Sequence, residues 1–512
     1  MPFRRFDLIA CLMTALFIMP VSTFAQEDAA GGTEDTAEVE RQDAPPSETT
    51  TGIFSLLPPD STTEHVLHGR DRDLAYKATA GTLDLYAGDG TQSAKIFYTA
   101  YVAKDGGTDR PLTFAFNGGP GAASAYLHLG LVGPKILAFG KDGHDGTRPE
   151  LTDNPDSWLA FTDLVLIDPV GTGWSRAKND STARNFYSVD ADAESLAKVI
   201  ALYTQKNERL ASPKFLLGES YGGFRAAKVA TTLKKSQGIL TSGIVMLSPM
   251  IDGRFLPVGQ LDPVLAAVQL PSLAAAKLER EGQFSEAAMA DAERFAMTDY
   301  LVSLAGPTPT GLEAEQLYNR IADLTGLPTE AVSETRGFVG NIYTKQAAGP
   351  GHIVSAYDAS APVADAYPES GGDHNDDPVL EGFTRAYGPA FANYARHELG
   401  YPSDMTYTLL STEVNRRWDW DGSRGEADAS GDLRDLLSVI PSFRLAIMHG
   451  YSDILTPFGA SRYVLDHLPA NLAENRAELY VYRGGHMFYT DADSRRLATD
   501  DARRFYANEG TN

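Results

Sequence analysis

The chain has 512 residues, of which 43% are hydrophobic, enough to bury the core of one large domain with an insertion or of two smaller domains. Its formal net charge is −24. This composition excludes a nucleic-acid partner, because a phosphate-binding surface needs an excess of Lys and Arg that is absent here.

The first 25 residues have the pattern of a signal peptide. Arg4 and Arg5 form a basic start, residues 8–21 are mostly apolar, and residues 23–25 include small side chains suited to cleavage. The apolar run is too short for a comfortable transmembrane helix, and Cys11 comes too early in it for a lipoprotein box. We expect an exported protein, periplasmic or secreted, that is cleaved after Ala25 and has no stable membrane span.

Residues 26–60 are rich in Asp, Glu, Ser, Thr and Pro, and Arg41 is their only basic residue. Such a composition cannot repay the entropy of ordering, so we expect a disordered acidic leader. Cys11 is the only cysteine of the chain, so the cleaved protein would contain no disulfide.

Short apolar runs at 83–86 and 94–98, bounded by Gly and Asp, predict antiparallel hairpins. The following runs are continuously apolar, which is typical of strands covered on both faces, and helical segments at 191–206 and 223–235 lie between some of them. The pattern predicts an α/β fold with a doubly wound, mostly parallel sheet. Its strands are expected at Leu112–Phe116, Leu164–Ile167, Phe215–Leu217, Ile244–Leu247, Phe443–Met448 and Leu479–Tyr482.

The strand pattern lapses between Asp252 and about Pro441. Residues 270–297 are rich in Ala, Leu, Glu and Arg at helical spacing, and residues 346–377 have the composition of a long loop. We therefore expect an inserted, largely helical cap at 252–441. The hydrolase core would then comprise residues 61–251 and 442–512.

Gly218-Glu-Ser220-Tyr-Gly222 follows a predicted strand and precedes a predicted helix. A serine hydroxyl is a weak nucleophile at neutral pH, so it must sit on a sharp turn with room for a base beside it. The flanking glycines remove the side chains that would block that turn. Ser220 is therefore the predicted nucleophile.

A nucleophile elbow requires a carboxylate and then a histidine later in the chain. Asp453 follows an apolar strand, at the sheet edge where ligands gather. His486 follows the last strand beside two glycines, a loop setting that suits a general base, whereas His467 lies in a helical stretch. We predict Asp453 as the orienting acid and His486 as the base, and a structural role for His449.

The tetrahedral intermediate of acyl transfer needs two backbone N–H donors aimed at its oxygen. The amide of Tyr221, directly after the nucleophile, is the expected first donor. The glycine-rich loop Asn117–Gly121 follows an earlier strand, and Gly119 is the expected second donor.

Five motifs together resemble the signatures of the serine carboxypeptidase family, and the chain is similar to a bacterial-type exported member. The resemblance implies that Asn117, Gly118 and Glu219 bind the C-terminal carboxylate of a peptide substrate. The motifs are Asn117-Gly-Gly-Pro-Gly-Ala-Ala-Ser124, Asp168-Pro-Val-Gly-Thr-Gly-Trp-Ser175, Gly218-Glu-Ser-Tyr-Gly222, His449-Gly-Tyr-Ser-Asp453 and Gly485-His-Met487.

A substrate carboxylate beside Glu219 would be repelled unless one of the two groups carries a proton, so the pKa of Glu219 should be raised. The family's second glutamate falls by ungapped counting at Leu131, which puts the acidic pH optimum in doubt. Its tryptophan falls at Ala115 and its motif cysteine at Ala122, so recognition of the C-terminus is also in doubt.

The sequence therefore predicts a serine-type carboxypeptidase acting on peptides with a free C-terminus. An esterase or acyltransferase, or an aminopeptidase of the same fold, would use the same triad, although an aminopeptidase typically has histidine in place of Asn117. A catalytically inactive binding module is a further alternative. No cofactor is expected and no metal site, since the sequence has no His-Glu-x-x-His motif and no cysteine pair. Side-chain preference and oligomeric state stay open.

Overall fold

The computed structural model describes residues 52–140, 143–256, 261–371 and 376–507. The predicted signal peptide and most of the predicted leader lie outside these residues. Where the leader is described, it departs from the expected disorder, because Gly52–Leu56 forms a 3-10 helix and Phe54 is only 4% exposed. Burial of this aromatic ring opposes the entropy cost of ordering that the polar composition suggested would dominate.

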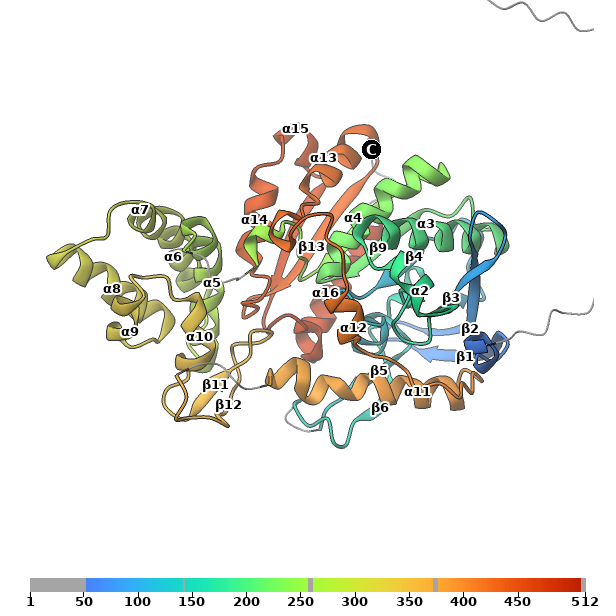
Figure 1. The fold of residues 1–512 in the computed structure, drawn as a ribbon, viewed down its shortest axis with the longest axis horizontal. Coiled ribbons are helices and arrows are strands. Elements are labelled where there is room, and N and C mark those ends of the chain that lie inside the picture. The colour runs from blue at the N-terminus through green and yellow to red at the C-terminus, as the bar shows by residue number, and fades with distance from the viewer. Residues whose placement is uncertain (1–51, 141–142, 257–260, 372–375, 508–512) are drawn as a thin grey trace, which may run out of the picture. The chain divides into compact units, whose positions relative to one another are not determined.

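A ten-stranded sheet forms the centre of the described chain (Figure 1). The strands follow the order β1-β2-β3-β7-β4-β9-β10-β13-β14, and β8 pairs with β3. Pairing is antiparallel from β1 to β7 and parallel from β7 to β14, so the predicted mostly parallel α/β sheet is confirmed. Its strands are β1 (Ser61–His68), β2 (Asp73–Tyr86), β3 (Gln92–Ala103), β4 (Leu112–Phe116), β7 (Asp163–Ile167), β8 (Arg176–Ala177), β9 (Lys214–Glu219), β10 (Gly243–Leu247), β13 (Arg444–Gly450) and β14 (Ala477–Tyr482).

Each parallel strand from β4 to β13 divides its side chains between two apolar layers. On β4, Phe114 packs into one core cluster with α3 and α4, whereas Ala115 packs into another with α11 and α16. Both faces of the sheet from β4 to β13 are therefore covered by apolar side chains, which explains why these strands are continuously apolar. The helices that cover the sheet include α1 (Ala125–Leu127), α2 (Asp180–Ala183), α3 (Val189–Lys206), α4 (Tyr221–Thr232), α11 (Tyr387–His397), α13 (Ser430–Val439), α14 (Phe458–Asp466), α15 (Ala470–Ala473) and α16 (Ala492–Ala507).

The chain between β10 and β13 is largely helical. Helices α5 to α10 lie to one side of the sheet in Figure 1 and share an apolar cluster of their own, into which Ile454 from the loop after β13 also packs. The segment 346–377, predicted as a loop, contains one short antiparallel pair. The elements are α5 (Pro263–Arg280), α6 (Glu286–Phe295), α7 (Leu301–Ala305), α8 (Gly311–Thr325), α9 (Thr329–Glu334), α10 (Gly340–Gln346), β11 (His352–Val354), β12 (Pro362–Ala364) and α12 (Thr412–Arg416); a further hairpin, β5 (Lys135–Ala138) and β6 (Glu150–Asp153), lies earlier in the chain.

Parts of this insertion pack on the sheet layers. Helix α13 contributes Leu433 and Leu437 to the core cluster of α3 and α4, and Phe391 of α11 packs against Phe97 of β3. The cap boundaries 252–441 therefore stay a prediction at the level of domains. Within the described ranges, no helix is both long and apolar enough to cross a membrane.

Candidate active site

Ser220 forms a sharp turn between β9 and α4. Its backbone φ is 61°, a conformation that L residues rarely adopt and that is typical of nucleophile elbows. Ser220 N donates to Leu247 O over 2.9 Å, and Met250 N donates to Ser220 O over 3.1 Å. Glycine is required beside the serine, because a Cβ at Gly218 would lie 1.9 Å from Gly222 O. The local sequence thus folds into the turn that its pattern predicted.

Asp453 and His486 lie in the loops after β13 and β14 and form a buried pair. His486 Nδ1 is 2.7 Å from Asp453 Oδ2, and Asp453 is 0% exposed. Thr456 Oγ1 donates to the same carboxylate oxygen over 2.7 Å, and Asp453 Oδ1 accepts the backbone N–H of Leu455 and of Thr456. An ionised carboxylate only accepts hydrogen bonds, so Nδ1 carries the proton and Nε2 keeps the lone pair that a general base needs.

The loop of His486 is fixed by its backbone. His486 N donates to Tyr357 O over 2.5 Å, and Ser248 Oγ donates to His486 O over 2.8 Å. The imidazole also meets the Tyr357 ring edge to face, at 5.1 Å between centroids. Burial opposes a charged imidazole, but Asp453, Glu219 and Asp377 together outweigh it, so the pKa of His486 is raised above its ordinary value.

The glycine-rich loop lies against the first turn of α4. A Cβ at Gly118 would lie 2.6 Å from Tyr221 N, so only glycine allows this approach. The first amides of a helix have no partner within the helix and carry its partial positive charge. Gly119, with a φ of 102°, is the next residue of the loop and lines the cavity that Ser220 also lines. The two amides predicted to bind the oxyanion, those of Gly119 and Tyr221, thus belong to segments in direct contact.

Glu219 is buried directly before the serine and is only 3% exposed. Its Oε2 accepts hydrogen bonds from Asn117 Nδ2 over 2.7 Å and from the Tyr489 hydroxyl over 2.8 Å. Asn117 is itself held by Leu127 N, which donates to its Oδ1 over 3.1 Å. Burial raises the pKa of Glu219, although His486, Tyr489 and Asn117 act in the opposite direction. The raised pKa expected from sequence is present in the structure.

One cavity of about 510 Å³ connects these groups. Ser220, His486, Glu219 and the loop from Asn117 to Gly119 all line it, as do Arg416 and Arg424. Such a volume is in the range of sites that bind small molecules or short peptide ends. Ser220 and His486, far apart in sequence, therefore open into the same space.

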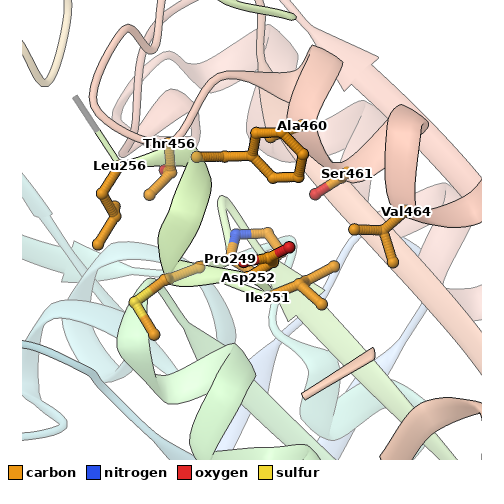
Figure 2. Close-up of a pocket in the computed structure, with 10 residues that line it drawn as sticks. Pro249, Ile251, Asp252, Leu256, Thr456, Ala460, Ser461 and Val464 are labelled. Carbon is orange, nitrogen blue, oxygen red and sulfur yellow. The ribbon is translucent and has the colours of Figure 1, made fainter. Parts of the chain in front are cut away.

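Figure 2 shows a second, small cavity, which is lined by Thr456 together with Asp252, Ala460 and Ser461. It has a volume of about 10 Å³, room for a single water at most. This hollow beside the acid loop is too small to receive a substrate.

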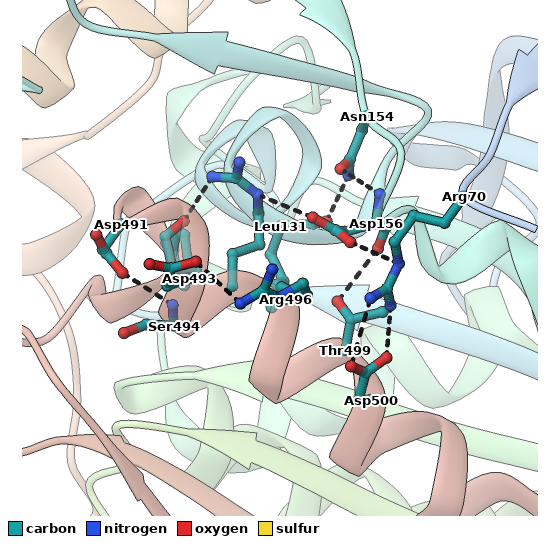
Figure 3. A network of polar contacts seen from close by, with 12 residues as sticks. Arg70, Leu131, Asn154, Asp156, Asp491, Asp493, Ser494, Arg496, Thr499 and Asp500 are labelled. Atoms are coloured by element: carbon teal, nitrogen blue, oxygen red, sulfur yellow. Dashed lines mark hydrogen bonds and ion pairs between the residues drawn. The ribbon is translucent and has the colours of Figure 1, made fainter. Parts of the chain in front are cut away.

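Leu131 lies in a π-helical turn at His128–Val132 and is fully buried in the apolar cluster that includes α11 and α16. The position counted for a second glutamate is therefore a core position, as leucine implies. In Figure 3 this turn is tied to its surroundings by Asn154, whose Nδ2 donates to Leu131 O over 2.7 Å. In the same network Asp156 N donates to Asn154 Oδ1 over 3.1 Å, and the Asp156 carboxylate pairs with Arg70 at 3.0 Å. Ala115 is buried on β4, and Ala122 lines the cavity.

Two histidines set aside by the sequence analysis lie outside the cavity. His449 is buried, and its Nε2 is 2.8 Å from Ser461 Oγ; burial lowers its pKa to about 4. His467 is exposed and bonds Tyr463 O. Within the described residues, no group of three or more His, Cys, Asp or Glu side chains is arranged to hold a metal ion.

Sequence reasoning missed Thr456, Tyr489 and the two cavity arginines. Thr456 lies three residues after Asp453, a spacing at which an aspartate side chain can accept hydrogen bonds from the following residues of a turn. This spacing could have indicated the contact from sequence. Tyr489 had no such signal, because its contact with Glu219 joins residues 270 positions apart. Arg416 and Arg424 lie in irregular or short helical segments of the insertion, which periodicity does not place.

On this mostly parallel sheet, Ser220 at a strand–helix elbow and His486 line one cavity, and the buried Asp453 pairs with His486. These are features of an α/β hydrolase. Residues 72–253, less than half of the chain, match the family model described as serine carboxypeptidase.

Curated relatives are similar to this chain over limited segments. The pheromone-processing carboxypeptidase KEX1 of Yarrowia lipolytica is 28% identical over 204 residues, 39% of this chain and 31% of that protein. Carboxypeptidase S1 of Penicillium janthinellum is 28% identical over 151 residues, 29% of this chain and 33% of that protein. The chain thus spans about a third of the length of the curated relatives it matches. These relatives are fungal and do not support the bacterial-type qualifier.

A solved structure of KEX1(delta)p from Saccharomyces cerevisiae, described as a prohormone-processing carboxypeptidase, is similar in fold. The two share 17% sequence identity with a TM-score of 0.51, covering 85% of this chain and 92% of that one. At this identity the likeness concerns the α/β-hydrolase fold alone.

Proposed function

We propose that this chain is a serine-type carboxypeptidase that releases C-terminal residues from peptides through an acyl-enzyme. The observation that carries the proposal is the adjacency of Glu219 to Ser220 in one cavity. A buried carboxyl with a raised pKa beside a nucleophile suits a substrate whose own carboxylate lies next to the bond to be cut.

In the proposed mechanism, His486 Nε2 takes the proton of Ser220 as its Oγ attacks the last peptide carbonyl. The amides of Tyr221 and Gly119 stabilise the oxyanion. His486 then protonates the leaving amino group, which departs as the released residue. Water, deprotonated by His486, hydrolyses the acyl-enzyme and restores the Ser220 hydroxyl.

Asn117, Gly118 and protonated Glu219 are proposed to hold the terminal carboxylate. Two donors already occupy Oε2, and among the described residues none donates to Oε1. Oε1 is therefore the oxygen that remains for the substrate, and a proton on it converts repulsion into a hydrogen bond.

The test offers the purified protein one peptide in free, C-amidated and N-acetylated forms, with Ser220→Ala as the control. A carboxypeptidase shortens the free and acetylated peptides by one residue at the C-terminus and leaves the amidated form intact. Loss of activity only on acetylation would support an aminopeptidase instead. Hydrolysis of esters without peptide cleavage would support an esterase or acyltransferase.

Export is proposed on the pattern of residues 1–25 alone. N-terminal sequencing of protein recovered from outside the cytoplasm should begin after Ala25. Recovery of an uncleaved chain from the cytoplasm would contradict the proposal.

A further inference from the structure

Tyr489 stands out among the groups around Glu219, because it follows His486 by three residues and yet contacts the residue before the nucleophile. Its hydroxyl donates to Glu219 Oε2 over 2.8 Å. The ring is fully buried, and glycine at position 130 makes room for it, since a Cβ there would lie 2.5 Å from Tyr489 Cε2.

The backbone of Tyr489 is also anchored. Tyr489 O accepts a hydrogen bond from Arg495 Nη1 over 3.0 Å. Arg495 belongs to α16, the helix that joins the polar network of Figure 3 through Thr499, whose hydroxyl donates to Asp156 O over 3.1 Å. The position of the hydroxyl is thus set by packing on one side and by hydrogen bonds on the other.

We propose that Tyr489 is a positioning residue that keeps Glu219 ready to bind a substrate carboxylate, by occupying Oε2 as a permanent donor and so directing the acid proton to Oε1. The inference rests on the proposed carboxypeptidase function. Asn117 Nδ2 donates to the same oxygen and assists in this. An oxygen that accepts two hydrogen bonds is a poor place for a proton, whereas Oε1 has no such donor among the described residues.

The chemistry of a phenol makes this arrangement differ from a pair of carboxylic acids. A second carboxyl would donate only while protonated, and the two acids would titrate as a coupled pair. The Tyr489 hydroxyl keeps its proton throughout the working range, because burial raises its pKa well above the ordinary value. Glu219 should therefore titrate as a single group.

Several other groups face Glu219 and influence its charge. His486 lines the same cavity, and Asp453 is buried beside His486. His486 lowers the pKa of Glu219, whereas Asp453 raises it. The hydroxyls of three further tyrosines interact with it electrostatically, from α1, from the loop between β11 and β12, and from α11. These are Tyr126, Tyr357 and Tyr387.

The experiment follows the protonated carboxyl band of Glu219 by difference infrared spectroscopy across pH, with Glu219→Gln identifying the band. In the unaltered protein the band should disappear in one single-proton step. Tyr489→Phe removes a donor that favours the carboxylate, so the midpoint should move up by about one pH unit. Tyr387→Phe is the matched control, a buried tyrosine near Glu219 without a hydrogen bond to it, and should leave the midpoint almost unchanged.

The same variants are compared by the pH dependence of KM for an N-blocked peptide with a free C-terminus. With Tyr489→Phe, the rise of KM at high pH should move upward together with the infrared midpoint, while kcat for a neutral ester is retained. An unshifted midpoint, or a two-proton transition in the unaltered protein, would overturn the role of Tyr489. If peptides are not shortened from the C-terminus, the proposed function fails, but the infrared band still reports whether Tyr489 governs Glu219. The unaltered protein alone tests the single-proton step if the variant does not fold.

Discussion

Replacing Glu219 by Gln should remove the pH dependence of substrate binding. At high pH the ionised carboxylate of Glu219 would face the carboxylate of the substrate. Two unit charges about 4 Å apart at an effective dielectric constant of about 20 repel by about 4 kcal/mol, which corresponds to about a 10³-fold rise in KM. Glu219 is only 3% exposed, so solvent screens this repulsion weakly. The amide of Gln can accept from Asn117 and Tyr489 and donate to the substrate at every pH.

The assay measures KM for an N-blocked dipeptide with a free carboxylate from acidic to alkaline pH. KM should rise with pH in the unaltered protein and stay flat in Glu219→Gln. Glu293→Gln is the control, because this partly buried glutamate also has a raised pKa but does not line the cavity. The same rise of KM in Glu219→Gln would refute the assignment of Glu219 to the substrate carboxylate.

Three further predictions concern the base and the cavity wall. Thr456→Val removes a donor to the Asp453 carboxylate and should lower kcat about tenfold with the fold intact by circular dichroism. An unchanged kcat would exclude support of the acid by Thr456. The kcat for a neutral ester should rise with pH as His486 loses its proton. Because the pKa of His486 is raised, the midpoint of this rise should lie above that of an ordinary histidine. A midpoint at or below the ordinary histidine value would contradict this role of His486. Arg416 and Arg424 line the cavity without an acidic partner in the described parts of the chain. Arg424→Gln should therefore lower kcat/KM for substrates with acidic side chains by about tenfold relative to neutral substrates. An equal loss of kcat/KM on both kinds of substrate would argue against charge recognition.

Strands buried on both faces are the part of this fold that local sequence predicts well. Each of the six expected apolar runs became a strand of the central sheet, with ends shifted by no more than two residues. In β4, β7, β9, β10 and β13 the continuous apolar character follows from burial on both faces, and that character can be read without knowing the partner strands. The edge strand β14 is mostly half-buried. The leader was harder to delimit, because its polar composition does not indicate that Phe54 is buried.

Local sequence also determined the nucleophile turn, since the close approach at Gly218 and the positive φ of Ser220 involve only neighbouring residues. The order of acid and base along the chain was expected from the nucleophile elbow, and their place in loops after strands was expected from the parallel sheet, whose strands end at one edge. Only the tertiary structure decided which groups surround Glu219. Tyr489 reaches it across 270 residues, and a polar contact between segments so far apart leaves no periodic trace in either of them.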